Sequence, residues 1–95
     1  MQESRVTGIT EILRLHLPHK KRVNPRGWIQ FNAVCCHHRG HKPETRGRGN
    51  LMITDTGASY NCYNCGYKTR FDGHSLSGSF QNFLGWLGVS REEIQ

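Results

Sequence analysis

Apolar residues near the start of the chain repeat at helical spacing. On a helix over residues 7–17 they share one face: Ile9, Ile12, Leu13 and Leu17. Thr7 precedes the run as the expected N-cap, and Pro18 follows it, where a helix would end. The pattern predicts a short amphipathic helix over residues 7–17.

A second helical pattern lies near the end of the chain. Its apolar positions are Phe80, Phe83, Leu84 and Leu87. Ser77 or Ser79 would begin this helix, and Gly88 would close it. Ser90 and Glu93 have the spacing of a capping box, which predicts one more helix. Because the chain stops within a turn of that point, we expect it to be the front of a longer protein.

The residues between the two helical patterns alternate as strands do. From residue 28 to residue 35, Ile29, Phe31 and Ala33 would share a buried face, with Trp28 on the opposite face. Residues 51–54 and 58–62 are expected to pair as a hairpin, with Gly57 in a left-handed turn conformation. Residues 67–71 are a candidate for a further strand.

Two stretches have the composition of loops. Residues 18–27 are basic and contain Pro25 and Gly27. Residues 39–49 contain no apolar side chain that could anchor them in a core, so they are expected to form an exposed, mobile arm.

Two pairs of metal-ligand residues flank this arm. Cys35 and His38 form the first pair and Cys62 and Cys65 the second, each separated by two residues. Two turns of this kind can place four donor atoms around one zinc ion, and four protein ligands leave no position open for water. Gly66, after the second pair, suits a knuckle in which the backbone reaches positive φ. The spacing predicts one structural zinc ion.

The first pair has alternatives because donors crowd around it. Cys36, His37 and His41 lie beside Cys35 and His38, so Cys36 with His41, or a pair that includes His37, could serve instead. Two disulfides are the other arrangement open to four cysteines. The adjacent cysteines, the histidines and the absence of an apolar leader favour a reducing compartment, the cytoplasm. A redox role for Cys62 and Cys65 is disfavoured, because no strand-turn-helix context surrounds them.

These elements indicate a small α+β fold. We expect a zinc ribbon with a three- to four-stranded antiparallel sheet and short flanking helices, divided into residues 1–27 (helix and basic loop), 28–73 (ribbon) and 74–95 (helix and the start of a linker or helix to a further domain). A chain of 95 residues buries little surface, and metal affinity can supply the missing folding free energy. No apolar run approaches the ~20 residues that span a bilayer, so we expect a soluble protein without a membrane partner.

Positive charge is concentrated in the middle of the chain. The formal net charge is +6, and ten of the 13 basic residues lie between positions 19 and 70, with only two acids. A cationic centre around a metal site favours a polyanion such as nucleic acid. The seven acids are scattered, so the chain lacks the carboxylate cluster that nucleotidyl transfer needs and is not expected to be an enzyme by itself.

Aromatic residues lie among these cations. Flat rings next to positive charges suit the unstacked bases of single strands, whereas arginines in the glycine-rich arm suit phosphates. The candidate nucleic-acid-binding residues are Trp28, Lys42, Arg46, Arg48, Tyr60, Tyr63, Lys68 and Arg70.

The sequence resembles the N-terminal zinc-binding domain of bacterial-type DNA primases, most closely those of large tailed bacteriophages. The resemblance covers nearly the whole chain. It is carried by the helix ending at Pro18, the strand into Cys35 and His38, the stretch from Lys42 to Gly49, and the knuckle sequence at residues 61–67.

This resemblance implies a role in starting RNA primers during DNA replication. The domain would recognise a short sequence in single-stranded template DNA and work with a primase catalytic domain and a replicative helicase. Cys35, His38, Cys62 and Cys65 match the metal ligands of the family. Two other functions remain open: a duplex-DNA-binding transcription regulator, and a ribbon that docks on another replication protein.

Overall fold

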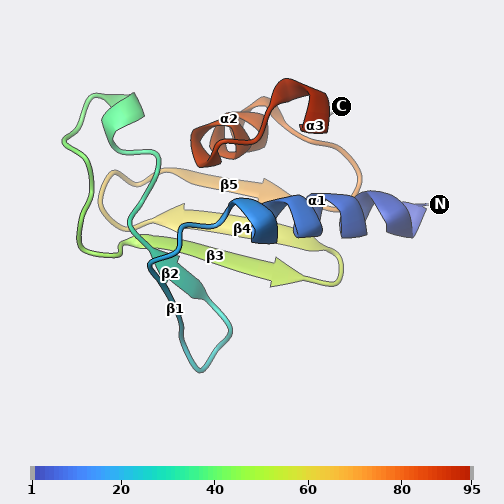
Figure 1. Cartoon of the computed structure of the whole chain (residues 1–95), viewed down its shortest axis with the longest axis horizontal. Helices are drawn as coiled ribbons and strands as arrows, with labels where there is room; N and C mark the ends of the chain where they lie inside the picture. The colour runs from blue at the N-terminus through green and yellow to red at the C-terminus, as the bar shows by residue number, and fades with distance from the viewer. Residues whose placement is uncertain (1, 95) are drawn as a thin grey trace.

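The computed structural model describes residues 2–94, and the side chains of residues 8–94. Figure 1 shows a five-stranded sheet with helices from both ends of the chain. The helices are α1 (Gln2–His16), α2 (Gly78–Leu87) and α3 (Arg91–Ile94), and a 3₁₀ turn, η1, covers His37–Arg39. The strands are β1 (Lys21–Val23), β2 (Ile29–Phe31), β3 (Gly49–Thr54), β4 (Gly57–Cys62) and β5 (Lys68–Phe71). The small α+β architecture agrees with the prediction.

The sheet is antiparallel, and its strands follow the order of the chain, β1-β2-β3-β4-β5. The predicted strand count was too low because of β1, which lies in the segment predicted to be a loop. All three residues of β1 are exposed, and Arg22 pairs with Gln30 across the β1–β2 hairpin. This strand carries no alternation of buried and exposed residues, so only its pairing with β2 reveals it.

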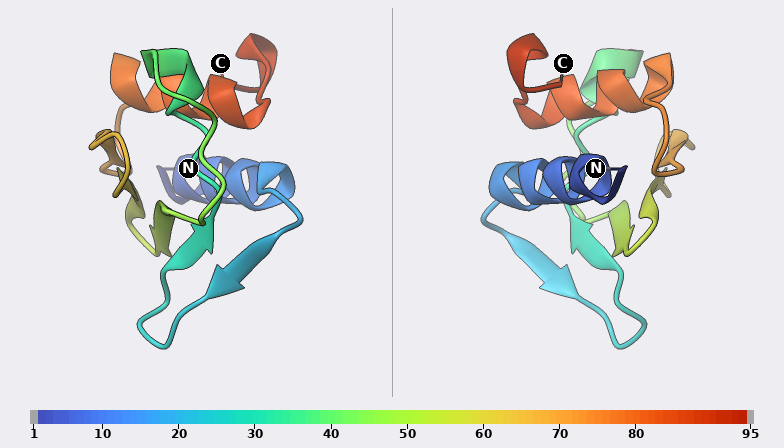
Figure 2. Two further views of the ribbon diagram at one scale, coloured as in Figure 1. Left: turned by 90° about the vertical axis from the view of Figure 1, so that its left-hand side faces the viewer. Right: turned by 90° about the vertical axis from the view of Figure 1, so that its right-hand side faces the viewer.

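One face of the sheet carries the core. Residues from α1 and α2, including Leu13 and Phe83, join inward-facing residues such as Leu51 and Tyr60 in one buried cluster. Tyr60 stacks on Phe83 with their ring centroids 4.1 Å apart. Both helices therefore cover the same side of the curled sheet, and Figure 2 shows the other side of β3, β4 and β5 without a helix. We call this uncovered side the outer face.

The observed helix ends can be compared with the caps predicted from the sequence. α1 begins at Gln2, so the expected N-cap Thr7 lies inside the helix and that prediction was wrong. The other predicted caps are confirmed: the Ser77 side chain accepts a hydrogen bond from the Phe80 N–H, and Gly88 closes α2 with φ 104°. At the start of α3 the Ser90 hydroxyl accepts a hydrogen bond from the Glu93 backbone N–H and donates one to the Glu93 carboxylate.

Gly57 has a different role from the one predicted. It is the first residue of β4 and does not have positive φ. A Cβ atom at this position would lie 2.0 Å from the carbonyl oxygen of Phe71. Glycine is therefore required by the close approach of β5 and not by the turn.

Among the described residues, no helix is long and apolar enough to cross a membrane.

Candidate metal centre

Four cysteine side chains converge at one edge of the sheet. The sulfur atoms of Cys35, Cys36, Cys62 and Cys65 all lie within 4.8 Å of one another. Cys35, Cys36 and Cys62 are buried, whereas Cys65 is partly exposed. None of them forms a disulfide, so the structure favours a metal site over the pair of disulfides.

Strand topology explains why these cysteines meet. β2 and β4 both run antiparallel to β3, so they run parallel to each other and end at the same edge of the sheet. Cys35 and Cys36 follow β2, and Cys62 is the last residue of β4. That edge is at the left of Figure 1, where β4 ends.

The second cysteine pair forms a tight knuckle. Gly66 has φ 83°, as predicted for the glycine that follows the pair. The backbone N–H groups of Asn64 and Cys65 each lie 3.4 Å from the Cys62 sulfur and donate to it. The turn is therefore already folded around the sulfur it presents.

The sulfur spacing fits one tetrahedral ion. With metal–sulfur bonds of about 2.3 Å, the sulfurs of a regular tetrahedron lie about 3.8 Å apart. Here the sulfurs of Cys35 and Cys65 are 3.3 Å apart, and those of Cys36 and Cys62 are 3.6 Å apart. The four thiols are thus compatible with a single bound metal ion.

The sulfurs of Cys35, Cys36 and Cys65 also have hydrogen-bond partners other than the neighbouring thiols. The Tyr60 hydroxyl lies 3.2 Å from the Cys35 sulfur, and the Asn64 side-chain amide donates to Cys36 at 3.2 Å. Arg39 donates to the Cys65 sulfur at 3.4 Å. Such donors stabilise thiolates and orient metal ligands.

The thiols have different acidities. Burial raises the pKa of Cys35 and Cys36. Burial acts in the same direction on Cys65, but the Tyr67 N–H, Cys35 and Arg39 outweigh it and lower its pKa to about 7. A divalent cation would favour all four thiolates, because its charge opposes the cost of burying them.

The structure corrects one predicted ligand. His38 lies outside the four-thiol group, and Cys36 takes its place. The exposed His38 ring lies in η1 and stacks on Trp86, with centroids 5.2 Å apart. The sequence alternatives with His37 or His41 are not formed either. The use of adjacent cysteines was missed because the spacing argument assumed that two residues separate the ligands of each pair.

Two of the predicted nucleic-acid-binding residues lie on the outer face. Lys68 and Arg70 pair with Asn61 and Ser59 across β4 and β5, opposite in direction to the buried Tyr60. The backbone N–H of Tyr63 donates to the Arg48 carbonyl at 3.0 Å, which places the knuckle beside the arm. Tyr63 is 71% exposed, so its ring is accessible to a ligand.

Two other predicted nucleic-acid-binding residues are buried or half-buried. Tyr60 is fully buried and cannot stack on a base, so that prediction was wrong; its hydroxyl faces Cys35 instead. Trp28 is half-buried and comes just before β2, where strand alternation puts it on the same face as Gln30.

The arm is exposed, but it is anchored. Its single acid, Glu44, is buried and accepts hydrogen bonds from the backbone N–H groups of Ala33, Arg46 and Arg48. Lys42, Arg46 and Arg48 line a hollow of about 330 Å³, to which Glu44 and Asn64 also contribute. The arm thus presents its cations beside the thiol cluster.

Comparison of the chain with protein-family models, curated proteins and solved structures finds no match in any of the three.

Proposed function

We propose that this chain is a zinc-ribbon domain that binds single-stranded DNA and recognises the template for a DNA primase. The observation that carries the proposal is the placement of cations and an exposed aromatic ring around the four-thiol cluster. Arg46 and Arg48 stand on one side of the knuckle, Lys68 and Arg70 lie on β5, and Tyr63 lies at the tip of the knuckle.

The metal in this proposal is zinc, and its role is structural. Cys35, Cys36, Cys62 and Cys65 would hold it, and tetrahedral thiolate coordination is typical of zinc. The ion would join the segment after β2 to the knuckle after β4. It would thereby fix the position of Tyr63 relative to the arm.

The electrostatic balance supports an anionic ligand. A divalent ion with four thiolates carries a net charge of about −2, and Arg39 already lies against this cluster. The arm and β5 cations are exposed. Because the site would lower the formal net charge of +6 to about +4, the loaded chain would still present a cationic surface, which would attract nucleic acid.

A single strand suits this surface better than a duplex does. Tyr63 can stack on an unpaired base, and such stacking contributes about 1–3 kcal/mol per base. A protein that reads a duplex with a helix inserts that helix in the major groove. Both longer helices, α1 and α2, pack against the sheet through buried residues and are not free to enter a groove.

The primase assignment rests on the sequence resemblance. In that role the domain would bind a short template sequence and present the template to a catalytic domain, with a replicative helicase nearby. The chain would contribute recognition, and the nucleotidyl transfer would take place in the catalytic domain.

The first test compares the affinity of the zinc-loaded chain for labelled single-stranded DNA and for the matching duplex, by fluorescence anisotropy. We expect a preference for the single strand. Replacing both Arg46 and Arg48 with alanine should weaken binding and reduce the salt dependence, with a slope smaller by about 1.4 for two phosphate contacts on a single strand. The backbone N–H donors to Glu44 remain in this variant, so the arm should stay anchored.

The matched control replaces Arg14 and Arg91, exposed residues of α1 and α3, and removes the same charge. An equal loss of affinity in the control would show that only net charge matters. A clear preference for duplex DNA would contradict the proposal and favour the transcription regulator. Selection from random oligonucleotides tests the primase role, which requires enrichment of a short motif.

A further inference from the structure

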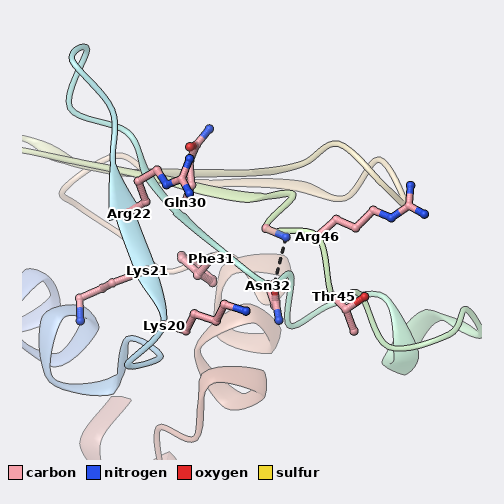
Figure 3. Close-up of a pocket in the computed structure, with 9 residues that line it drawn as sticks. Lys20, Lys21, Arg22, Gln30, Phe31, Asn32, Thr45 and Arg46 are labelled. Carbon is pink, nitrogen blue, oxygen red and sulfur yellow. Dashed lines mark hydrogen bonds between the residues drawn. The ribbon is translucent and has the colours of Figure 1, made fainter.

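A groove of about 290 Å³ lies between β1, β2 and the arm (Figure 3). It adjoins the nucleic-acid surface proposed above, since Arg46 borders both hollows. Its base is formed by the β1–β2 hairpin, which the sequence did not predict. Basic and amide side chains dominate its lining, and no carboxylate is among the described residues that form it.

Strand register aligns the polar side chains of this groove. Arg22 pairs with Gln30, and the same register, continued by one step of alternation, puts Lys20 opposite Asn32. Figure 3 shows Arg22 beside Gln30, and the Lys20 ammonium group close to the Asn32 amide. The four side chains thus form two neighbouring pairs along one wall.

Asn32 has a fixed orientation. Its Oδ1 atom accepts a hydrogen bond from the backbone N–H of Gly47 in the arm at 2.9 Å. The oxygen is therefore engaged, and the amide nitrogen is the atom that Asn32 offers to a ligand. Together with Lys20 it makes this end of the groove a cluster of hydrogen-bond donors.

The other two cations of the lining are less directly involved. Lys21 donates to the carbonyl oxygen of Pro18 at 3.3 Å, and Figure 3 shows its side chain directed away from Asn32. The Arg46 side chain also extends away from the groove in this view. Lys20 and the Asn32 amide nitrogen therefore lie at one end of the wall, where they match the charge and the acceptor oxygens of one phosphate group, and Arg22 adds positive charge at the other end, beside Gln30.

We infer that the groove is a phosphate-binding site, in which Lys20 and Asn32 hold one phosphate of a nucleotide ligand and Arg22 adds positive charge farther along the wall. This inference deepens the proposed function and rests on it for the identity of the ligand. The phosphate can come from the backbone of a bound strand or from the end of a free nucleotide. In the first case the groove extends the strand's path from the arm toward β1.

The sharpest variant is Asn32→Asp in the zinc-loaded chain. The new carboxylate can still accept the Gly47 N–H, but it adds a negative charge and removes the amide donor. The matched control is Asn82→Asp, the same change at an exposed position of α2. Circular dichroism and zinc content, measured for both, establish that the fold is retained.

Two probes separate the possible sources of phosphate. Binding of a labelled oligothymidine is followed by anisotropy, and binding of inorganic triphosphate by calorimetry. We expect Asn32→Asp to weaken at least one of them by about tenfold or more, because like charges placed in contact are strongly unfavourable. Asn82→Asp should change both by much less. Replacing Lys20 with alanine should reduce the salt slope for the oligonucleotide by about 0.7, the value for one phosphate contact on a single strand.

The outcomes distinguish the two proposals. Loss of oligonucleotide affinity alone would assign the groove to the strand backbone, and loss of triphosphate affinity would assign it to terminal phosphates. If the wild-type chain binds the oligonucleotide and both aspartate variants bind it equally well, without a triphosphate effect, the groove inference is wrong and the proposed function stands. If the wild-type chain binds triphosphate but no single strand, the proposed function fails and the groove remains a phosphate site. If it binds neither probe, both proposals fail.

Discussion

The Glu44 carboxylate accepts a hydrogen bond from the backbone N–H of Ala33 at 2.6 Å. Ala33 lies two residues before Cys35, so this contact joins the arm directly to the segment that carries the first two thiols. The same carboxylate accepts the N–H groups of Arg46 and Arg48. A single buried acid thus connects the arm that carries the cations to the segment that leads into the thiol cluster.

Glu44→Gln should destabilise the fold. A glutamine side chain offers one acceptor oxygen where the carboxylate offers two, and it lacks the charge that strengthens these bonds. We expect a loss of about 1–3 kcal/mol, the usual effect of leaving buried donors without a partner. Urea unfolding of the zinc-loaded chain measures it. Glu11→Gln, at an exposed position of α1, is the control and should leave the unfolding midpoint unchanged.

The contribution of Glu44 should depend on pH. Burial by itself raises the pKa of its carboxyl, but the N–H groups of Ala33, Arg48 and Arg46 and the charge of Arg48 together hold it below its usual value. The stabilisation is therefore fully present above the unfolded-state pKa of about 4.3 and is lost as pH falls through the lower folded-state pKa.

Wild type and Glu44→Gln, compared by urea unfolding from neutral pH downward, should differ by a constant amount near neutrality and converge on the acid side. Zinc release on acidification affects both proteins, so the difference between them isolates Glu44. A difference that grows as pH falls would contradict the assigned pKa direction.

Cys36 and His38 should differ sharply in metal binding. Cys36→Ser removes one of four converging sulfurs and should lower zinc affinity strongly, whereas His38→Ala removes only a ring stacked on Trp86. Elemental analysis and competition with a chelator measure both effects. Cobalt substitution provides a second readout, because the absorption of four-sulfur coordination differs from that of three. Zinc lost from His38→Ala and kept in Cys36→Ser would restore the ligand set predicted from spacing.

Tyr60→Phe should weaken metal binding without unfolding the protein. The ring packs against Phe83 and is preserved, whereas the hydroxyl group beside the Cys35 sulfur is removed. Loss of a hydrogen bond to a ligand typically costs about 10–100-fold in metal affinity. Chelator competition gives the affinity, and near-ultraviolet circular dichroism reports the packing. Unchanged affinity would show that the Cys35 thiolate does not depend on this donor.

Gly57→Ala should destabilise the β4–β5 pair. The added Cβ would lie 2.0 Å from the Phe71 carbonyl oxygen, so the two strands must move apart. We expect a loss of about 1–3 kcal/mol, as for other overpacked sites. Gly85→Ala is the contrasting control: it lies within α2 with nothing within 4 Å of its Cβ position, and should stabilise the helix by about 0.5–1 kcal/mol. Thermal unfolding compares the two.

Local signals in the sequence were sufficient for the helix α2 and its ends. Ser77, Gly88 and Ser90 act on backbone groups within a few residues of themselves, so their roles follow from spacing alone. The buried face of β2 followed in the same way from the alternation of Ile29 and Phe31.

The candidate site was only partly predictable. The positions of Cys62, Cys65 and Gly66 describe one compact turn, and that turn forms as spacing suggests. The segment after β2 offered several donors next to one another. Which of them face the knuckle depends on how η1 turns the backbone, and nothing in the local spacing specifies that turn.

The amino-acid sequence by itself determined the amphipathic helices, the knuckle, the supply of cysteine and histidine side chains that can bind a metal, and the basic centre of the chain. Each of these depends on residue type and short-range periodicity. The tertiary structure decided which side chains meet. It placed Cys36 rather than His38 beside the other thiols, buried Tyr60 against the cluster, paired β1 with β2, and inserted Glu44 under the arm. These four outcomes depend on contacts between separate segments of the chain, and the free energies of those contacts appear only when the segments are packed together.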